Sequence, residues 1–308
     1  MEKSNIKIFS FLDENQGSMI GVHTSDGTFN LTLAFQIYQH AKGIRKPIDF
    51  SFLQVLVEMG YCSGSVIREI LSESWVSAKK EQLLIETTPK YELPISRPTK
   101  IICLGRNYRE HAKELDHEIP DEPIFFSKAP SSLIPHDKDI IIPEWLNTRV
   151  DHEAELALIV GKRCKNIAAK DALSYISGYT ILNDITARDM QKKDIAQKRP
   201  WLRSKSIDTF CPVGPYIVPS DEIDNPHSLN INLKVNGKIR QKSSTSKMIF
   251  KIPDIVSYLS RFMTLEPGDI IATGTPHGVG PIVDGDLIEV TISEIGTLRN
   301  RVVKEASN

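Results

Sequence analysis

The chain has 308 residues, which is enough for one large domain or two smaller ones with a substantial core. Its 38 basic and 39 acidic residues nearly cancel, so no strong field favours nucleic acid or a membrane surface as a partner. The four cysteines are scattered without a Cys-x-x-Cys pair, which argues against a disulfide framework or a thiolate zinc site. Because the N-terminus lacks an apolar leader and no run of about 18 apolar residues occurs, we expect a cytoplasmic protein.

Residues 1–95 are predicted to form a small N-terminal α+β accessory domain. Strand-like segments around an Asp-Gly turn predict a hairpin, and the helical spacing of apolar residues follows in LTLAFQIYQHA and FLQVLVEMG. Three prolines between residues 88 and 98 then exclude both a helix interior and a central strand. We therefore expect a domain boundary in that stretch.

Residues 96–308 are predicted to form a second, β-rich domain. Short apolar segments alternate with turns, and only three helices are expected, at roughly 109–115, 170–176 and 252–261. Many strands with few helices indicate a barrel or sandwich that carries peripheral helices. The predicted strands include KIICLG, PIFFSK, DIIIPE, ELALIVG, GYTILND, GPYIVP, LNINLKVNG, DIIATG and DLIEVTIS.

Three carboxylates in this second part are the first candidate site. Glu153 and Glu155 flank the start of an apolar strand and point to the same face, because side chains alternate along a strand. Asp184 ends a second apolar run and could supply a third oxygen. An anionic, all-oxygen set suits Mg²⁺, Mn²⁺ or Ca²⁺ rather than zinc or copper. The alternative is an edge strand whose two glutamates face solvent.

A second candidate is the segment GRNYREHAKEL, which follows a predicted strand directly. His111 and Glu114 are three residues apart and share one helical face. A carboxylate beside an imidazole orients the ring and raises its basicity, as a general base requires. The surrounding charged residues also allow a plain solvated helix face.

Several polar groups follow the third carboxylate. Lys205 could hold an anionic substrate or stabilise an enolate near a metal, although a surface salt bridge is the commoner fate of a lysine. The loop GDIIATGTPHGVG could present backbone N–H groups to an anion, but it lacks the lysine of a P-loop and could be a tight structural turn. His277 in that loop has no carboxylate partner nearby in the sequence and is interpreted as a rim or packing residue.

Taken together, these segments resemble the fumarylacetoacetate hydrolase (FAH) family, in particular bacterial members with a small N-terminal domain. The resemblance implies an α+β, β-rich fold, with a mixed β-barrel-like roll, peripheral helices and a dimeric assembly. It also implies the following site: Mg²⁺ or Mn²⁺ at Glu153, Glu155 and Asp184, with Ca²⁺ as a non-physiological occupant; His111, Glu114 and Lys205 as catalytic residues; and Arg188, Gln191 and Thr275 facing the substrate. The match rests on five segments in the family's order: ICLGRNYREHAKEL, DHEAELALIVG, GYTILNDITARDMQ, RSKSIDTFCPVGP and GDIIATGTPHGVG.

The activities implied by the resemblance share a metal-stabilised enolate of a small anionic 2-oxo acid. We expect hydrolysis of a C–C bond in an acylpyruvate such as acetylpyruvate or fumarylpyruvate. Oxaloacetate decarboxylation and isomerisation or tautomerisation of a 5-carboxymethyl-2-hydroxymuconate-type acid remain alternatives. The basic segment KKDIAQKRPWLRS varies in the family, so substrate choice is not transferred across it. A metal-binding scaffold or sensor without turnover is the non-enzymatic alternative.

Overall fold

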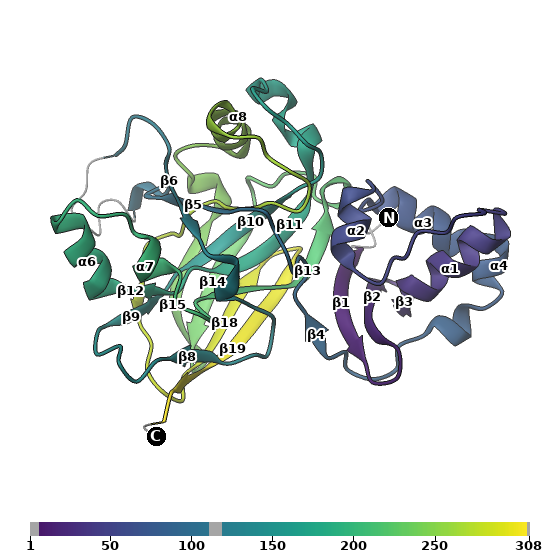
Figure 1. The fold of residues 1–308 in the computed structure, drawn as a ribbon, viewed down its shortest axis with the longest axis horizontal. Helices are drawn as coiled ribbons and strands as arrows, with labels where there is room; N and C mark the ends of the chain where they lie inside the picture. Colours follow the sequence, from purple (N-terminus) through teal and green to yellow (C-terminus); the bar gives the residue numbers. More distant parts are fainter. Residues whose placement is uncertain (1–5, 111–118, 307–308) are drawn as a thin grey trace.

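The computed structural model describes residues 6–110 and 119–306, and its fold is α+β and rich in strands (Figure 1). The described strands form three sheets, with eleven, five and three members. The largest sheet ends at β3 (Gly27–Asn30) on one side and β6 (Ile124–Lys128) on the other, so the described strands do not close into a barrel. The predicted β-rich roll with peripheral helices is confirmed as an open arrangement of sheets.

The N-terminal part begins with three antiparallel strands, β1 (Lys7–Asp13), β2 (Gly17–Thr24) and β3. The predicted Asp-Gly turn joins β2 to β3, and its glycine adopts a φ of 138°, a conformation that side chains disfavour. Asn30 then caps the first helix by accepting a hydrogen bond from the Leu33 backbone N–H. The helices that follow include the two predicted ones: α1 (Leu31–Ala41), α2 (Leu53–Glu58), α3 (Gly64–Ser72), α4 (Ser74–Ser77) and the 3₁₀ helix η1 (Lys80–Leu83).

This N-terminal part is joined to the rest of the protein by strand pairing and by a shared core. Strand β1 pairs antiparallel with β13 (Cys211–Pro219), so the N-terminal strands extend the large sheet. One apolar cluster contains both Leu56 from α2 and Ile159 from the middle of that sheet. The division of the chain at residue 95 stays a prediction, since the sheet and the apolar cluster both continue across it.

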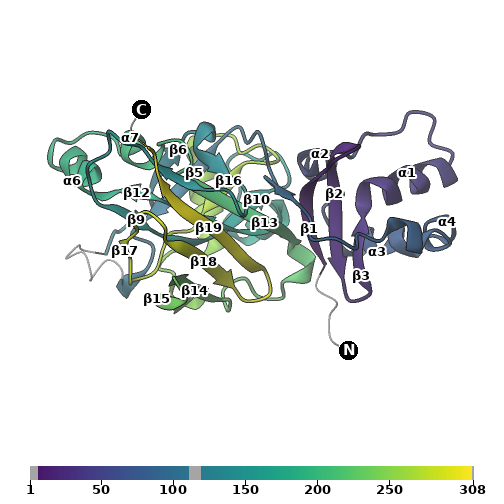
Figure 2. The same cartoon turned by 90° about the horizontal axis from the view of Figure 1, so that it is seen from below.

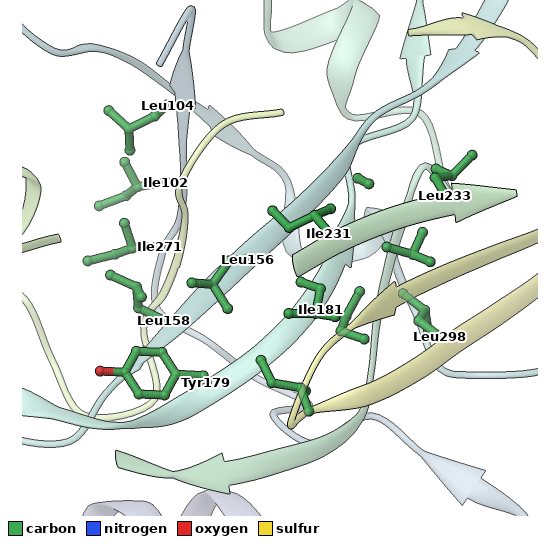
Figure 3. Packing of buried hydrophobic residues seen from close by; sticks show 14 of the residues in the cluster. Ile102, Leu104, Leu156, Leu158, Tyr179, Ile181, Ile231, Leu233, Ile271 and Leu298 are labelled. Carbon is green, nitrogen blue, oxygen red and sulfur yellow. The ribbon is translucent and has the colours of Figure 1, made fainter. Parts of the chain in front are cut away.

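The centre of the large sheet is β10 (Ala154–Val160), which is buried along its whole length. It lies between β11 (Ile176–Asn183) and β16 (Ile270–Ala272), and β16 pairs in parallel with β5 (Ile101–Gly105). Both faces of β10 are covered, which explains why its sequence is an unbroken apolar run after Glu155. Figure 3 shows the resulting core, in which Leu156 and Leu158 pack near residues of several other strands.

The five-stranded sheet packs against the large one and completes the core. Its order is β15 (Lys238–Ser244), β14 (Asn230–Val235), β18 (Leu287–Ile292), β19 (Gly296–Lys304) and β8 (Ile140–Ile142). Figure 2 shows β18 and β19 crossing the strands of the large sheet, and residues of both sheets share one apolar cluster. The smallest sheet consists of β12 (Thr186–Ala187), β9 (Val150–His152) and β17 (Gly280–Pro281).

The remaining elements are short apart from α8 (Ile252–Phe262), which confirms the predicted helix there. The helix expected near residues 170–176 is the 3₁₀ helix η3 (Ala169–Tyr175), and most of the one expected at 109–115 lies outside the described residues. No helix in the described part of the chain is long and apolar enough to cross a membrane. The others are α6 (Arg188–Ala196), α7 (Leu202–Lys205), β4 (Tyr91–Glu92), β7 (Leu133–Ile134), η2 (Pro130–Ser132), η4 (Ser220–Glu222) and η5 (Thr245–Lys247).

Candidate metal centre and adjoining pocket

The acidic cluster lies at one end of the paired strands β10 and β11. Ala154 on β10 pairs with Asn183 on β11, so the next residues, Glu153 and Asp184, are also brought side by side. The Asp184 backbone N–H donates to the Glu153 carbonyl at 2.8 Å, and the Glu153 N–H donates to Oδ1 of Asn183 at 2.9 Å. Glu153 itself occupies a one-residue break between β9 and β10 rather than the interior of a strand.

One oxygen from each of Glu153, Glu155 and Asp184 lies within 4.8 Å of the others, and all three residues are buried. The solvent-facing alternative for the two glutamates is therefore wrong. Burial, reinforced by the neighbouring Asp184 and Glu153 carboxylates, raises the pKa of Glu155 well above its ordinary value. The Gly274 backbone N–H donates to Oε2 of Glu155 at 2.7 Å and holds that side chain in place.

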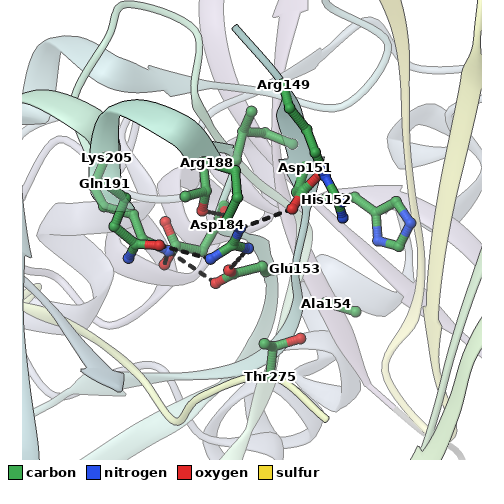
Figure 4. Close-up of polar contacts among 12 residues, drawn as sticks. Arg149, Asp151, His152, Glu153, Ala154, Asp184, Arg188, Gln191, Lys205 and Thr275 are labelled. Carbon is green, nitrogen blue, oxygen red and sulfur yellow. Dashed lines mark hydrogen bonds and ion pairs between the residues drawn. The ribbon is translucent and has the colours of Figure 1, made fainter. Parts of the chain in front are cut away.

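Two buried lysines contact the cluster. Lys205 Nζ lies 2.8 Å from Oε2 of Glu153 and 2.6 Å from Oδ2 of Asp184 (Figure 4). Lys128 Nζ lies 2.6 Å from the other Asp184 oxygen, Oδ1. Burial alone would lower the pKa of Lys205, but the Asp184 and Glu153 carboxylates outweigh it and raise the pKa, which keeps the ammonium charged.

Arg188 contacts the cluster, and each of its three guanidinium nitrogens donates a hydrogen bond. Its Nε donates to Oδ2 of Asp151 at 2.7 Å and its Nη1 to Oε1 of Gln191 at 2.7 Å, while Nη2 donates to Oε1 of Glu153. Arg188 opens α6 directly after β12, so the small sheet places it beside β9, the strand that carries Asp151. A guanidinium paired in this way fixes the orientation of the Glu153 carboxylate.

The charges of the cluster fit a divalent cation. Four cationic side chains, those of Lys128, Lys205, Arg149 and Arg188, contact Asp151, Glu153 and Asp184, and within the described part of the chain none of them forms an ion pair with Glu155. Glu155 is buried, so its charged form is costly without a cation beside it, in agreement with its raised pKa. The oxygens of Glu153, Glu155 and Asp184 are hard ligands of the kind that Mg²⁺ and Mn²⁺ prefer, so the residues present suit such an ion.

A pocket opens beside the cluster. Its floor includes Glu153 and Lys205, and its apolar wall includes Phe126 and Trp201, whose ring centroids lie 5.3 Å apart. The Lys205 ammonium also lies over the Phe126 ring, 5.0 Å from its centroid. The combination of an apolar wall with a few charged groups is typical of a small-molecule site.

The structure brings most of the predicted site residues together. Arg188, Gln191 and Thr275 line this pocket with Glu153 and Lys205. Their individual roles remain predictions, because what the structure gives is their placement. Thr275 Oγ1 accepts a hydrogen bond from Nε2 of Gln241 at 2.8 Å, a residue that our sequence analysis did not single out.

The predicted pair His111 and Glu114 lies outside the described residues. Glu110, the last residue before that segment, has one carboxylate oxygen 2.8 Å from Nδ1 of His277 and the other 2.8 Å from the ammonium of Lys247. His277 therefore has an acidic neighbour from a distant part of the sequence, and about two fifths of its side chain is exposed. Its interpretation as a rim or packing residue stays a prediction.

Lys128, Asp151, Arg106 and Trp201 were missed as site residues. Asp151 had a signal in the sequence, since it continues the alternation of Glu153 and Glu155 by one more step. Lys128 ends an apolar strand, a position where a lysine is usually solvated, and only its pairing with Asp184 reveals its role. Nothing in the sequence around Trp201 distinguishes it from an exposed loop residue.

Comparison with known proteins identifies the family. The description "Fumarylacetoacetate (FAA) hydrolase C-terminal" matches residues 100–303. The mitochondrial oxaloacetate tautomerase of Rattus norvegicus is 41% identical over 255 residues, which cover 80% of this chain and 78% of that protein. The chain belongs to the fumarylacetoacetate hydrolase family, as its motifs predicted.

Solved structures agree with this assignment over almost the whole chain. The fumarylacetoacetate hydrolase of psychrophilic Exiguobacterium antarcticum superposes with a TM-score of 0.79 at 33% identity, covering 97% of this chain and 100% of its own. The maleylpyruvate hydrolase of Sphingobium sp. SYK-6, in complex with manganese(II) and pyruvate, gives a TM-score of 0.76 at 30% identity with the same coverage. The family therefore contains hydrolases and tautomerases on this fold.

Proposed function

We propose that the protein is a divalent-metal-dependent enzyme that interconverts the keto and enol forms of a small 2-oxo acid of the oxaloacetate type. The observation that carries this proposal is the buried set of three carboxylates, of which Glu155 has no cationic side chain paired with it among the described residues, at the base of a pocket that also presents cations. A divalent ion bound there adds positive charge to a cluster whose four carboxylates already face four cationic side chains, so the loaded site is net positive, which suits an anionic 2-oxo acid. The similarity to a tautomerase named for oxaloacetate, at 41% identity, supports the choice of reaction.

Glu153, Glu155 and Asp184 would hold the ion, which we expect to be Mg²⁺ or Mn²⁺. When bound, such an ion supplies Lewis-acid polarisation of the 2-oxo group. Arg188 and the Gly274 N–H fix the orientation of Glu153 and Glu155, so these carboxylates need little rearrangement when an ion binds.

The remaining residues act on the substrate anion. The charged ammonium of Lys205 lies at the pocket floor. It would stabilise the negative charge that develops on the 2-oxo oxygen as a proton leaves the adjacent carbon. Phe126 and Trp201 exclude water from one wall, which strengthens that electrostatic effect. His111, oriented by Glu114, would move the proton between carbon and solvent, as the sequence predicts.

Hydrolysis of a C–C bond in an acylpyruvate is the second candidate. It is favoured by the likeness to a maleylpyruvate hydrolase across 97% of this chain. Both reactions need negative charge to be stabilised on the 2-oxo oxygen. In tautomerisation this charge develops as a proton leaves the adjacent carbon. In hydrolysis it develops as the C–C bond breaks after water has added to the distal carbonyl, so that the acyl group leaves as a carboxylic acid and pyruvate as its enolate. The reactions differ in whether His111 activates a water or returns a proton, and decarboxylation of oxaloacetate would need neither water nor a base.

The test is a parallel assay of chelator-treated protein, with and without added Mg²⁺ or Mn²⁺. The proposal expects metal-dependent loss of the ultraviolet absorbance of enol-oxaloacetate without release of pyruvate. Pyruvate from acetylpyruvate would move the assignment to the hydrolase, and pyruvate from oxaloacetate to the decarboxylase. Tight metal binding with no change in any of these acids would contradict an enzymatic role towards them and favour a scaffold or sensor.

A further inference from the structure

Arg106 has an unfavourable backbone conformation directly beside the site. It follows the last residue of β5 and adopts a φ of 56°, in the left-handed region. A residue other than glycine in this region costs about 1 kcal/mol relative to the ordinary helical conformation. Backbone strain of this kind occurs preferentially at active sites and ligand-binding sites.

Arg106 lines the pocket, and no carboxylate among the described residues contacts or shifts its guanidinium. Arg188 and Lys205 also line the pocket, but both are paired with carboxylates of the cluster. Arg106 is half-buried, and desolvation lowers its pKa. A partly desolvated cation without a counter-charge is unfavourable until an anion arrives, so this position favours an anionic ligand.

The surroundings of Arg106 would shield such a contact from water. Gly105 precedes it, and a Cβ added there would lie 3.0 Å from the Trp201 ring, so Trp201 packs closely on the backbone of this turn. The same ring lines the pocket beside Arg106. An ion pair formed next to an aromatic wall is screened less by solvent and is correspondingly stronger.

We propose that Arg106 is a specificity-determining residue that binds the second carboxylate of a 2-oxo dicarboxylate. The proposal rests on the function proposed above and narrows its substrate class. The first carboxylate and the 2-oxo group would occupy the metal end of the pocket, where the paired cations lie. The remote carboxylate would then take the guanidinium that has no protein partner, in the bidentate geometry that arginine offers.

The experiment compares the binding of oxaloacetate with that of 2-oxobutyrate. Oxaloacetate ends in a second carboxylate where 2-oxobutyrate ends in a methyl group. Binding to the Mg²⁺-loaded full chain is followed by tryptophan fluorescence, since Trp201 lines the pocket while Trp75 and Trp145 are largely exposed. The wild-type protein should bind oxaloacetate about 10- to 150-fold more tightly, the range expected for hydrogen bonds to a charged group. Arg106→Gly should remove this preference and leave the binding of 2-oxobutyrate unchanged.

Arg106→Gly suits this test because glycine accepts the left-handed backbone, so its thermal unfolding temperature should be equal to or higher than that of the wild type. The matched control is Lys198→Gly, which removes an exposed cation at another left-handed position, with a φ of 55°, outside the pocket. The control should keep the full preference for oxaloacetate. Equal binding of the two acids by the wild type, or a preference that survives Arg106→Gly, would overturn this inference alone. Failure of both acids to bind would contradict the proposed function and this inference with it.

Discussion

Lys205 and Asp184 form a fully buried ion pair, with Nζ and Oδ2 2.6 Å apart, and this pair joins the pocket to the acidic cluster. Asp184 accepts a second ammonium, that of Lys128, on its other oxygen. One carboxylate is thereby shared by two buried lysines while it also lies within 4.8 Å of two glutamates. The stability of this arrangement and the affinity of the site for a cation are therefore coupled, and each can be measured separately.

Removing one lysine should destabilise the metal-free protein. Lys128→Met keeps the volume of the side chain but leaves more negative charge unpaired in the core, which costs about 3–5 kcal/mol of unfolding free energy. Saturating Mn²⁺ should restore part of this loss, because the ion replaces the missing positive charge. Urea unfolding with and without Mn²⁺ measures both effects. Lys138→Met, at an exposed lysine, is the control, and equal sensitivity of the two variants would contradict the assigned role of Lys128.

Replacing Arg188 by lysine should weaken metal binding without unfolding the protein. A lysine cannot contact Asp151, Gln191 and Glu153 together, so the Glu153 carboxylate loses its fixed orientation. Loss of such a supporting contact lowers metal affinity by about 10- to 100-fold. Titration calorimetry with Mn²⁺ measures the change. Arg203→Lys alters an arginine–aspartate pair between α7 and α6 that does not include a cluster carboxylate, and the Mn²⁺ affinity of this variant should stay at the wild-type value.

His111→Ala tests the predicted base. Loss of a positioned proton-transfer group lowers a rate by about 10²- to 10⁴-fold, and we expect this for tautomerisation or hydrolysis. Decarboxylation of oxaloacetate should be spared, because it needs no base. Steady-state rates on oxaloacetate and acetylpyruvate, with Mn²⁺ affinity as the control, distinguish these cases. An equal loss in all reactions would indicate that His111 acts in substrate binding or in folding.

Protonation of His23 should lower the stability of the N-terminal part at acid pH. Burial, with a smaller contribution from Lys7, lowers the pKa of His23 from 6.5 to about 4, while its ring stacks on Phe9. Between these two pH values His23 is protonated in the unfolded chain but neutral in the folded protein. The free energy of unfolding therefore falls as the pH drops from about 6.5 towards 4. His23→Phe should flatten this part of the profile. Urea midpoints across that range give the comparison, and identical slopes for both proteins would rule out His23 as the cause.

The parts of the fold with regular patterns could be predicted from the sequence. The strand at Ala154–Val160 and the helix at Leu31–Ala41 have the bounds that their apolar periodicity indicates. The pairing of β1 with β13 had no signal, because contacts between residues some 200 positions apart depend on which strands meet in three dimensions. The acidic cluster was predictable for a local reason, since alternation places Glu153 beside Glu155. Lys128 was not, because its interaction with Asp184 spans 56 positions.

The most direct test of the account is a Mn²⁺ titration of chelator-treated protein, followed by electron paramagnetic resonance, for the wild type and Glu155→Gln. The substitution keeps the size of a buried ligand but removes its charge, and it also relieves repulsion from Asp184 and Glu153, so the variant should remain folded. We predict one tight Mn²⁺ site per chain in the wild type and none in the variant. Tight binding that survives in a folded Glu155→Gln protein would contradict the assignment of the metal centre to these three carboxylates.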